Sequence, residues 1–365
     1  MITKLTSFQQ KEFSCSIPDI GFSILGDRAG VKVVLTKSGS GKTVYDELLY
    51  PDEGGAVALT DVDRLVEPYA RKWLVFTLTV TISEQSVSTN ATTGEETVTV
   101  MDTKTLSTTV VSCRANILNT TAADFCRDHF LSLIGGAKQT ASGFLEYLSY
   151  IGSDTCRCTA WYDDGSSRGF NVSSLNPGSD YTLVNVSPDN FITSGRTLVR
   201  YLISAGSREQ EFELMNDCEP DIAPVLLFMN SFGVQELAYC TGEHKMVSSF
   251  DRKQTRIGRL KTSYQVDDKV TFKADTGYLS FPMAEWWRDV LRSKDIRVLP
   301  VQNGGVLVGE GLPVVISSEK VELSNAPDAL PRYTFEYEYA DRNHNVWDLR
   351  REGRIFDNTF DYTFN

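Results

Sequence analysis

The sequence contains only three histidines in 365 residues, which leaves little material for histidine-based catalysis. It also lacks any apolar run near the roughly 20 residues that a membrane-spanning helix needs. The first residues lead into a polar Gln-Gln-Lys-Glu segment, so we expect no signal peptide. Positive charge is scarce as well, and the net charge of −12 disfavours binding to nucleic acid through the overall field. We therefore expect no membrane span and no nucleic-acid partner.

The seven cysteines are odd in number and scattered without a repeat, which favours reduced, buried thiols over a disulfide framework. Four soft ligands for zinc are nevertheless present in Cys126, His129, Cys156 and Cys158. Their spacing fits no standard zinc finger, and phenylalanines flank the first pair. We therefore favour buried thiols and a packed histidine over a metal site, and predict no cofactor.

One glycine-rich stretch, Thr36–Thr43, follows a predicted strand and ends in Gly-Lys-Thr. A phosphate-binding loop needs glycine where Thr36 stands, and it needs a helix afterwards. Since Val44–Pro51 is a poor helix, the stretch predicts a solvated hairpin turn. No nucleophile with a neighbouring base is legible elsewhere, so we predict no enzyme. A polysaccharide hydrolase remains a third alternative, although spacing singles out no pair of acidic residues.

The composition favours strands, because Tyr, Phe, Trp, Thr and Val recur throughout the chain. We predict a mainly β fold of serial β-sandwich modules, resembling immunoglobulin or fibronectin domains in size, with a few short helices. The length favours two or three domains. The predicted units are an N-terminal β-sandwich (1–118), a middle β-sandwich with one leading helix (119–222), and a C-terminal α+β domain with an aromatic tail (223–365).

Local patterns place the strands. Trp73–Ile82 alternates between apolar and polar residues, and Asp163-Asp164-Gly165 is a strong hairpin signal between two strands. The clearest strand is Arg332–Ala340, in which every second residue is aromatic. We therefore expect the aromatic side chains Tyr333, Phe335, Tyr337 and Tyr339 to share one face of that strand.

Three short helices are predicted. The first lies within Asp61–Tyr69 and stops before or at Pro68. The second begins after Thr121, which resembles the start of a capping box, and stops at Gly135-Gly136. The third, Phe281–Leu291, carries apolar residues at helical spacing.

This third helix contains two adjacent tryptophans, Trp286 and Trp287, with Tyr278 and Phe281 nearby. Such aromatic residues could form a platform that stacks on a sugar ring, which would make a host surface glycan a partner. A helix that buries tryptophan against a sheet is the commoner arrangement, and both alternatives stay open at this point.

Two segments are candidate protein interfaces. The first is a basic cluster in an acidic chain, which is either a solvated loop or a surface that faces an acidic patch on another subunit. Besides His244, its residues are Lys245, Arg252, Lys253, Arg256, Arg259 and Lys261. The second is the alternating aromatic tail, of a kind that often adds to the sheet edge of a neighbour. Its aromatic residues are Phe356, Phe360, Tyr362 and Phe364.

Three segments, in this order, carry a family resemblance. The first is Tyr50–Gly55 with the helical Asp61–Tyr69 after it, the second is Leu227–Gly233, and the third is Tyr339–His344. Together they resemble phage and prophage structural proteins of Bacteroidetes hosts, of tail or virion-associated type. The resemblance implies a protein that is made in the host cytoplasm and joins a virion. It implies no catalytic residues.

The preferred hypothesis is therefore a structural component of a phage virion, of tail or baseplate type, that acts through oligomeric assembly. Its partners would be other virion proteins and copies of itself. The alternative is a carbohydrate- or receptor-binding module of a phage or a gut bacterium.

Overall fold

The computed structural model describes residues 1–215, 224–299, 301–302, 305–306, 311–320 and 330–341. Within these ranges strands dominate, and three α-helices lie between them. The prediction of a mainly β fold is confirmed. The finer prediction of immunoglobulin- or fibronectin-like sandwiches stays a prediction. Each sheet takes its strands from one of the three predicted segments, so among the described residues no strand pairing joins the segments.

The N-terminal unit is built on a five-stranded sheet in the order β1-β7-β6-β3-β4. Strand β1 runs parallel to β7, and the other neighbours are antiparallel. The alternating residues of β6 point Phe76, Leu78, Val80 and Ile82 into the core, as the sequence predicts. The strands are β1 (Lys11–Phe13), β3 (Arg28–Lys37), β4 (Ser40–Leu49), β6 (Val75–Thr89) and β7 (Glu96–Val111).

A second layer covers this core. It consists of the pair β2 (Ile20–Ser23) and β5 (Ala56–Leu59) and of helix α1 (Val62–Ala70). The helix continues through Pro68, so the predicted stop before or at that residue is wrong. Proline removes one backbone N–H, but the last turn still closes because the N–H of Arg71 donates to the carbonyl oxygen of Glu67 at 3.3 Å.

The middle unit combines a five-stranded sheet in the order β11-β10-β13-β14-β8 with the separate pair β12-β9. The predicted hairpin at Asp163-Asp164-Gly165 is confirmed, and Gly165 adopts the positive φ of 78° that this turn requires. The strands are β8 (Lys138–Thr140), β9 (Tyr147–Tyr150), β10 (Cys156–Tyr162), β11 (Ser167–Val172), β12 (Thr182–Asn185), β13 (Leu198–Ala205) and β14 (Arg208–Leu214), and a 3-10 helix η1 (Pro188–Phe191) follows β12.

Helix α2 (Ala122–Asp128) leads into this unit, and the hydroxyl of Thr121 caps it by accepting from the N–H of Asp124 at 3.1 Å. The predicted end at Gly135-Gly136 is wrong, because His129 already has extended backbone angles. After the helix, the N–H of Leu131 donates to the carbonyl oxygen of Ser149 at 2.7 Å. This bond holds the segment that follows the helix alongside β9.

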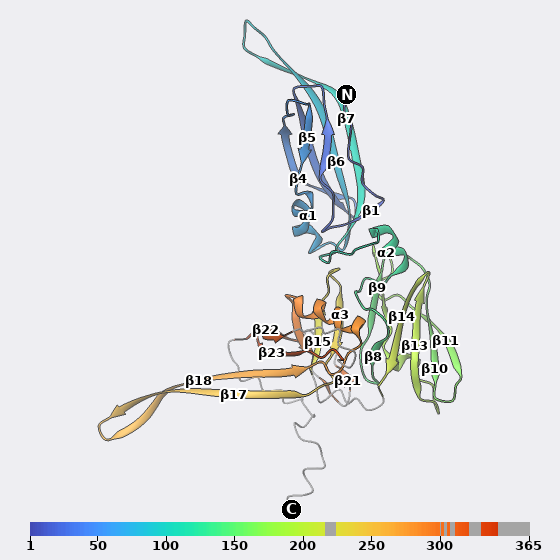
Figure 1. Ribbon diagram of the computed structural model, residues 1–365, viewed down its shortest axis with the longest axis vertical. Coiled ribbons are helices and arrows are strands. Elements are labelled where there is room, and N and C mark those ends of the chain that lie inside the picture. Colours follow the sequence, from blue (N-terminus) through green and yellow to red (C-terminus); the bar gives the residue numbers. More distant parts are fainter. Residues whose placement is uncertain (216–223, 300, 303–304, 307–310, 321–329, 342–365) are drawn as a thin grey trace, which may run out of the picture.

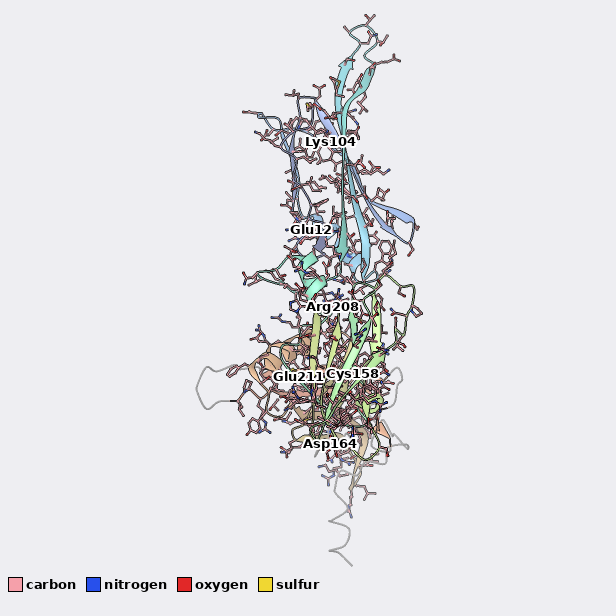
Figure 2. All side chains as sticks on the ribbon, turned by 90° about the vertical axis from the view of Figure 1, so that its right-hand side faces the viewer. Glu12, Lys104, Cys158, Asp164, Arg208 and Glu211 are labelled. Atoms are coloured by element: carbon pink, nitrogen blue, oxygen red, sulfur yellow. The ribbon has the colours of Figure 1, made fainter. Side chains whose placement is uncertain are left out.

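Arg208 fixes α2 to the middle sheet. It lies at the end of that sheet nearest the N-terminal unit (Figure 2) and is buried. Its guanidinium donates to the carbonyl oxygens of Cys126 and Ile151 and to the carboxylate of Asp154, the last at 2.8 Å. Arg208 thus supplies a hydrogen-bond donor to the carbonyl oxygen of Cys126, which lies in the last turn of the short helix.

The C-terminal unit is a seven-stranded sheet in the order β16-β15-β19-β22-β23-β18-β17 with helix α3 (Phe281–Arg292) packed on it. The predicted aromatic face is confirmed, since Tyr333, Phe335 and Tyr337 are buried against α3. The strands are β15 (Val225–Met229), β16 (Gln235–Tyr239), β17 (His244–Ile257), β18 (Leu260–Asp275), β19 (Ile296–Leu299), β22 (Leu312–Lys320) and β23 (Thr334–Tyr339), with the small pair β20 (Val301–Gln302) and β21 (Gly305–Val306) beside them.

The three units meet in one apolar cluster, which we call the junction cluster. Three rings define it, one from each unit: Phe13, Phe125 and Phe232. The ring centroids of Phe125 and Phe232 lie 5.1 Å apart in a stacked arrangement, and those of Phe13 and Phe125 lie 5.7 Å apart edge to face. Aromatic pairs at these separations are attractive, so the cluster ties the units together.

Figure 1 shows the consequence for the shape of the molecule. The N-terminal unit stands above the other two, which lie side by side. Helix α2 lies between the N-terminal unit and the middle unit. The hairpin of β17 and β18 reaches far out from the body on one side. In the part of the chain described above, no helix is long and apolar enough to cross a membrane.

Replacing Phe232 with alanine tests the junction cluster. Phe232 is fully buried, so Phe232→Ala leaves a cavity between three units and we expect a loss of about 3–5 kcal/mol in the free energy of unfolding. Urea denaturation followed by tryptophan fluorescence measures it. The control is Leu25→Ala at a side chain that is 90% exposed, for which we expect a change within about 0.5 kcal/mol. Equal stability of the two variants would contradict the role of the cluster.

Candidate functional site

The basic cluster from Lys245 to Lys261 lies on the hairpin of β17 and β18. Of the two alternatives for this cluster, the segment is solvent-exposed but is not a loop, because the two strands pair from His244 opposite Ala274 to Ile257 opposite Leu260, with one bulge between Lys253 and Gln254. Gly258, with φ of 63°, and Arg259 form the two-residue turn between them. Of the basic residues, Arg252, Lys253, Arg256, Arg259 and Lys261 gather toward the tip, and all are exposed.

On one face of this hairpin the register sets Asp268 opposite Phe250 and Arg252 opposite Val266, so charged residues interrupt that face. Four large apolar side chains are nevertheless exposed, Met246, Phe250 and Val266 on that face and Tyr264 at the bulge beside it, and we call these four the apolar stripe. Their exposed fractions lie between 45% and 65%, although these are large apolar side chains. The stripe continues the buried face of the sheet, since Val270 and Phe272 lie on the same side nearer the body and are buried. Ile257 and Leu260 add exposed apolar area at the tip.

The opposite face carries Lys269 and Lys273 together with the exposed Val247, and ion pairs fix it to the body. Lys273 contacts Glu336 at 2.5 Å, and Lys269 contacts Glu338 at 3.4 Å. At the base of the hairpin, the imidazole of His244 lies 2.9 Å from the hydroxyl of Tyr337 and stacks on the Phe272 ring. These contacts hold the base of the hairpin in the sheet, while its outer part makes contacts only within itself among those described.

Strand β17 is also an edge strand. Among the described residues it pairs only with β18, so the backbone groups along its outer side face away from the sheet. An edge of this length with apolar neighbours is a template for pairing with another chain. The apolar stripe, the open edge and the basic tip together form the strongest candidate interaction site.

Of the two alternatives for the tryptophans, the structure shows the commoner one, in which both are buried against the sheet, and not a sugar platform. Trp286 and Trp287 border a cavity of about 340 Å³, but each is only 1% exposed. Helix α3 turns both rings toward the sheet, where Trp286 meets Phe228 with ring centroids 5.8 Å apart. No open ring face is left at either residue for stacking on a sugar.

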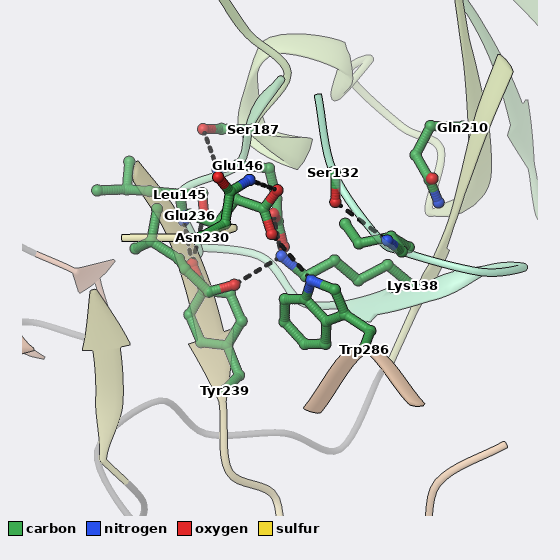
Figure 3. A network of polar contacts seen from close by, with 12 residues as sticks. Ser132, Lys138, Leu145, Glu146, Ser187, Gln210, Asn230, Glu236, Tyr239 and Trp286 are labelled. Atoms are coloured by element: carbon green, nitrogen blue, oxygen red, sulfur yellow. Dashed lines mark hydrogen bonds and ion pairs between the residues drawn. The ribbon is translucent and has the colours of Figure 1, made fainter. Parts of the chain in front are cut away.

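Trp286 instead belongs to a buried polar network between the middle and C-terminal units (Figure 3). Its indole N–H donates to one oxygen of Glu236 at 2.8 Å, and the amide of Asn230 donates to the other at 2.7 Å. Lys138 pairs with Glu146 at 2.6 Å and donates to the carbonyl oxygen of Leu237 at 2.8 Å. Lys138 and Glu146 come from the middle unit, and the other groups come from the C-terminal unit, so the network joins the two.

Burial governs the titration of these carboxyl groups. It raises the pKa of Glu146 above the usual 4.5, and the nearby Lys138 ammonium opposes the rise. Burial raises the pKa of Glu236 in the same way. Glu236 accepts from helix α3 and from the turn between β15 and β16, and Lys138 connects Glu146 to strand β16, so the network positions these elements against one another.

The remaining sequence candidates are placed as follows. Thr36–Thr43 spans the turn between β3 and β4, which confirms the hairpin prediction. Cys126 lies in the junction cluster, whereas Cys156 and Cys158 lie in the core of the middle unit, and all three are buried as predicted. His129 packs against Phe125 with ring centroids 4.9 Å apart and the two rings tilted by 32°. The tail residues Phe356, Phe360, Tyr362 and Phe364 lie outside the described residues.

Sequence reasoning missed the apolar stripe and the polar network. The stripe shows in the sequence as Met246, Phe250, Tyr264 and Val266 at even spacings, but charged residues between them hide the alternation. The network has no local signal, because Lys138 and Glu236 are far apart in the chain and meet only in the fold.

Comparison with known proteins adds no relative: the sequence matches no family model and no curated protein.

Replacing Lys138 with methionine tests the network. The change leaves Glu146 buried without its counter-charge, and we expect a loss of about 3–5 kcal/mol in stability near neutral pH. A carboxyl with a raised pKa binds its proton more tightly in the folded state, so stability falls as pH rises from 4.5 through the folded pKa. Without Lys138 that pKa rises further. The penalty of Lys138→Met should therefore be larger at pH 8 than at pH 5.

Urea denaturation of both proteins at the two pH values measures this difference. The control is Lys138→Met with Glu146→Gln, which removes the stranded charge and should recover part of the stability and most of the pH dependence. A penalty of equal size at both pH values would contradict the account.

Proposed function

We propose that the chain is a structural subunit of a phage virion, of tail or baseplate type, which assembles in the host cytoplasm through the β17–β18 hairpin onto a second copy of itself. The observation that carries this proposal is the apolar stripe, which is half exposed on a strand pair that extends beyond its own sheet. An isolated hairpin is at best marginally stable in water. A hairpin of this length is expected where another chain covers it.

The energetics of the stripe support a protein partner. Burying one large apolar side chain stabilises an interface by about 1.5–3 kcal/mol, and the stripe offers four. Open backbone groups along β17 add hydrogen bonds when a strand is laid beside it. The resemblance of Tyr50–Gly55, Leu227–Gly233 and Tyr339–His344 to phage structural proteins favours the same class of function.

Charge supports a second copy as the occupant. Five basic residues and no acidic residue lie between Arg252 and Lys261, in a chain whose net charge is −12. The positively charged tip is therefore attracted to the negatively charged surface of another copy, and such complementarity steers docking. Other virion proteins, or a host receptor, would emerge as partners if the purified chain does not associate with itself.

Light scattering of the purified full-length chain tests the proposal. We expect an oligomer whose mass falls with added salt, because part of the attraction is between exposed charges. Phe250→Ser should weaken association about tenfold or more by removing one buried anchor. Replacing Arg252, Arg256 and Arg259 together with glutamate should leave a monomer.

Matched controls separate the hairpin from general effects. Leu175→Ser changes a side chain that is 53% exposed on the middle unit, against 56% for Phe250, and should leave the mass unchanged. Replacing Lys42, Lys104 and Arg168 with glutamate changes the net charge as much as the hairpin variant does. A chain ending at Gly353 tests the predicted tail contact separately. A wild-type monomer at all concentrations, or hairpin variants that assemble like the wild type, would refute the proposal.

A further inference from the structure

A pair of thiols lies at the edge of the N-terminal unit, where β1 ends beside β7. Cys15 is exposed and Cys113 is buried, and both are free. Each sulfur lies 3.2 Å from the same atom, the carbonyl oxygen of Ala115. The two sulfurs are therefore neighbours although the residues are far apart in the chain.

The strand register explains the pairing. β1 runs parallel to β7 with Phe13 opposite Val111, and the N–H of Ser14 still donates to Val111 at 2.9 Å. Beyond Phe13 the chain turns, with the N–H of Ser16 donating to the carbonyl oxygen of Phe13 at 3.0 Å, and this turn sets Cys15 beside Cys113.

Ser14 holds this geometry from the inside. Its buried hydroxyl accepts from the N–H of Cys113 at 3.0 Å and donates to the carbonyl oxygen of Cys113 at 2.9 Å. The backbone at Cys113 is thus fixed against the turn that carries Cys15, which keeps the two thiols next to each other.

The surroundings of Cys15 admit a small charged molecule. A cavity of about 230 Å³ lies beside it, bordered by Arg64, Arg71 and Arg114 and by the acidic Asp63 and Glu67. Arg64 pairs with Asp61 and Arg71 pairs with Glu67. Guanidinium groups bind carboxylates, so these arginines can exchange a side-chain partner for a carboxylate of a peptide thiol such as glutathione that meets the exposed thiol.

We propose that Cys15 and Cys113 form a two-cysteine modification site that reacts with a low-molecular-weight disulfide, such as glutathione disulfide, and closes to an intramolecular disulfide. The Cys15 thiolate attacks one glutathione sulfur, and the other glutathione leaves as a thiolate. Cys113 then attacks the Cys15 sulfur and expels the second glutathione. The two protein thiols lose two electrons and two protons, and one glutathione disulfide becomes two glutathione thiols.

The order of the two steps follows from the environment. The Cys113 thiol hydrogen-bonds the Cys15 sulfur and lowers the pKa of Cys15, which makes Cys15 the attacking group. The same contact, together with burial, raises the pKa of Cys113, so Cys113 acts second. The inference is independent of the proposed function, because it depends only on residues of the N-terminal unit (1–118).

The test uses the folded full-length chain with glutathione disulfide under argon, quenched with an alkylating reagent and mapped by peptide mass spectrometry. We expect Cys15 joined to Cys113 and no glutathione left on the wild type. Cys113→Ser should stop with glutathione on Cys15. Cys15→Ser should slow the loss of the Cys113 thiol about tenfold or more, because the exposed attacking group is gone.

Cys156 and Cys158 serve as an internal control, since both are buried on one face of β10. They should stay reduced while the pair closes. Glutathione retained on wild-type Cys15, or a Cys113 that is alkylated as fast after treatment as before, would overturn the proposal. Oxidation of Cys156 and Cys158 at the same rate would also overturn it, because reaction would then follow unfolding.

Discussion

The structure depends on one tight turn between β15 and β16, at Asn230–Gly233. The side-chain oxygen of Asn230 accepts from the N–H groups of Phe232 and Val234, and its amide donates to Leu131 in the middle unit and to Glu236. The turn places Phe232 in the junction cluster, while the carbonyl oxygen of Ser231 accepts from Arg114 of the N-terminal segment. Three units with separate sheets thereby share one anchoring point.

The contacts between the units determine where the base of the β17–β18 hairpin lies. The polar network of Lys138, Glu146 and Glu236 locks the middle and C-terminal units together, and the sheet of the C-terminal unit holds the base of the hairpin. The base of the hairpin is therefore held in the sheet, and its outer part extends from the body with the apolar stripe and the basic tip exposed.

The sequence predicts local structure correctly where residues close together in the chain determine it. The cap at Thr121, the turn at Asp163-Asp164-Gly165 and the aromatic face around Phe335 all follow from nearest neighbours. The site was less readable. Composition alone does not decide whether tryptophans on a helix face solvent or a sheet. In the structure, Trp286 and Trp287 are buried against the sheet. The hairpin was hidden because a bulge between Lys253 and Gln254 breaks the alternation that its charged residues already obscure.

The most direct test of the central claim is hydrogen exchange of the full-length chain at concentrations below and above its association. If the hairpin is the interface, backbone amides of β17 and β18 beyond the buried Val270 slow on association, while those of the β6–β7 hairpin in the N-terminal unit keep their rates. Association that leaves the β17–β18 amides exchanging as fast as in the monomer would contradict the account.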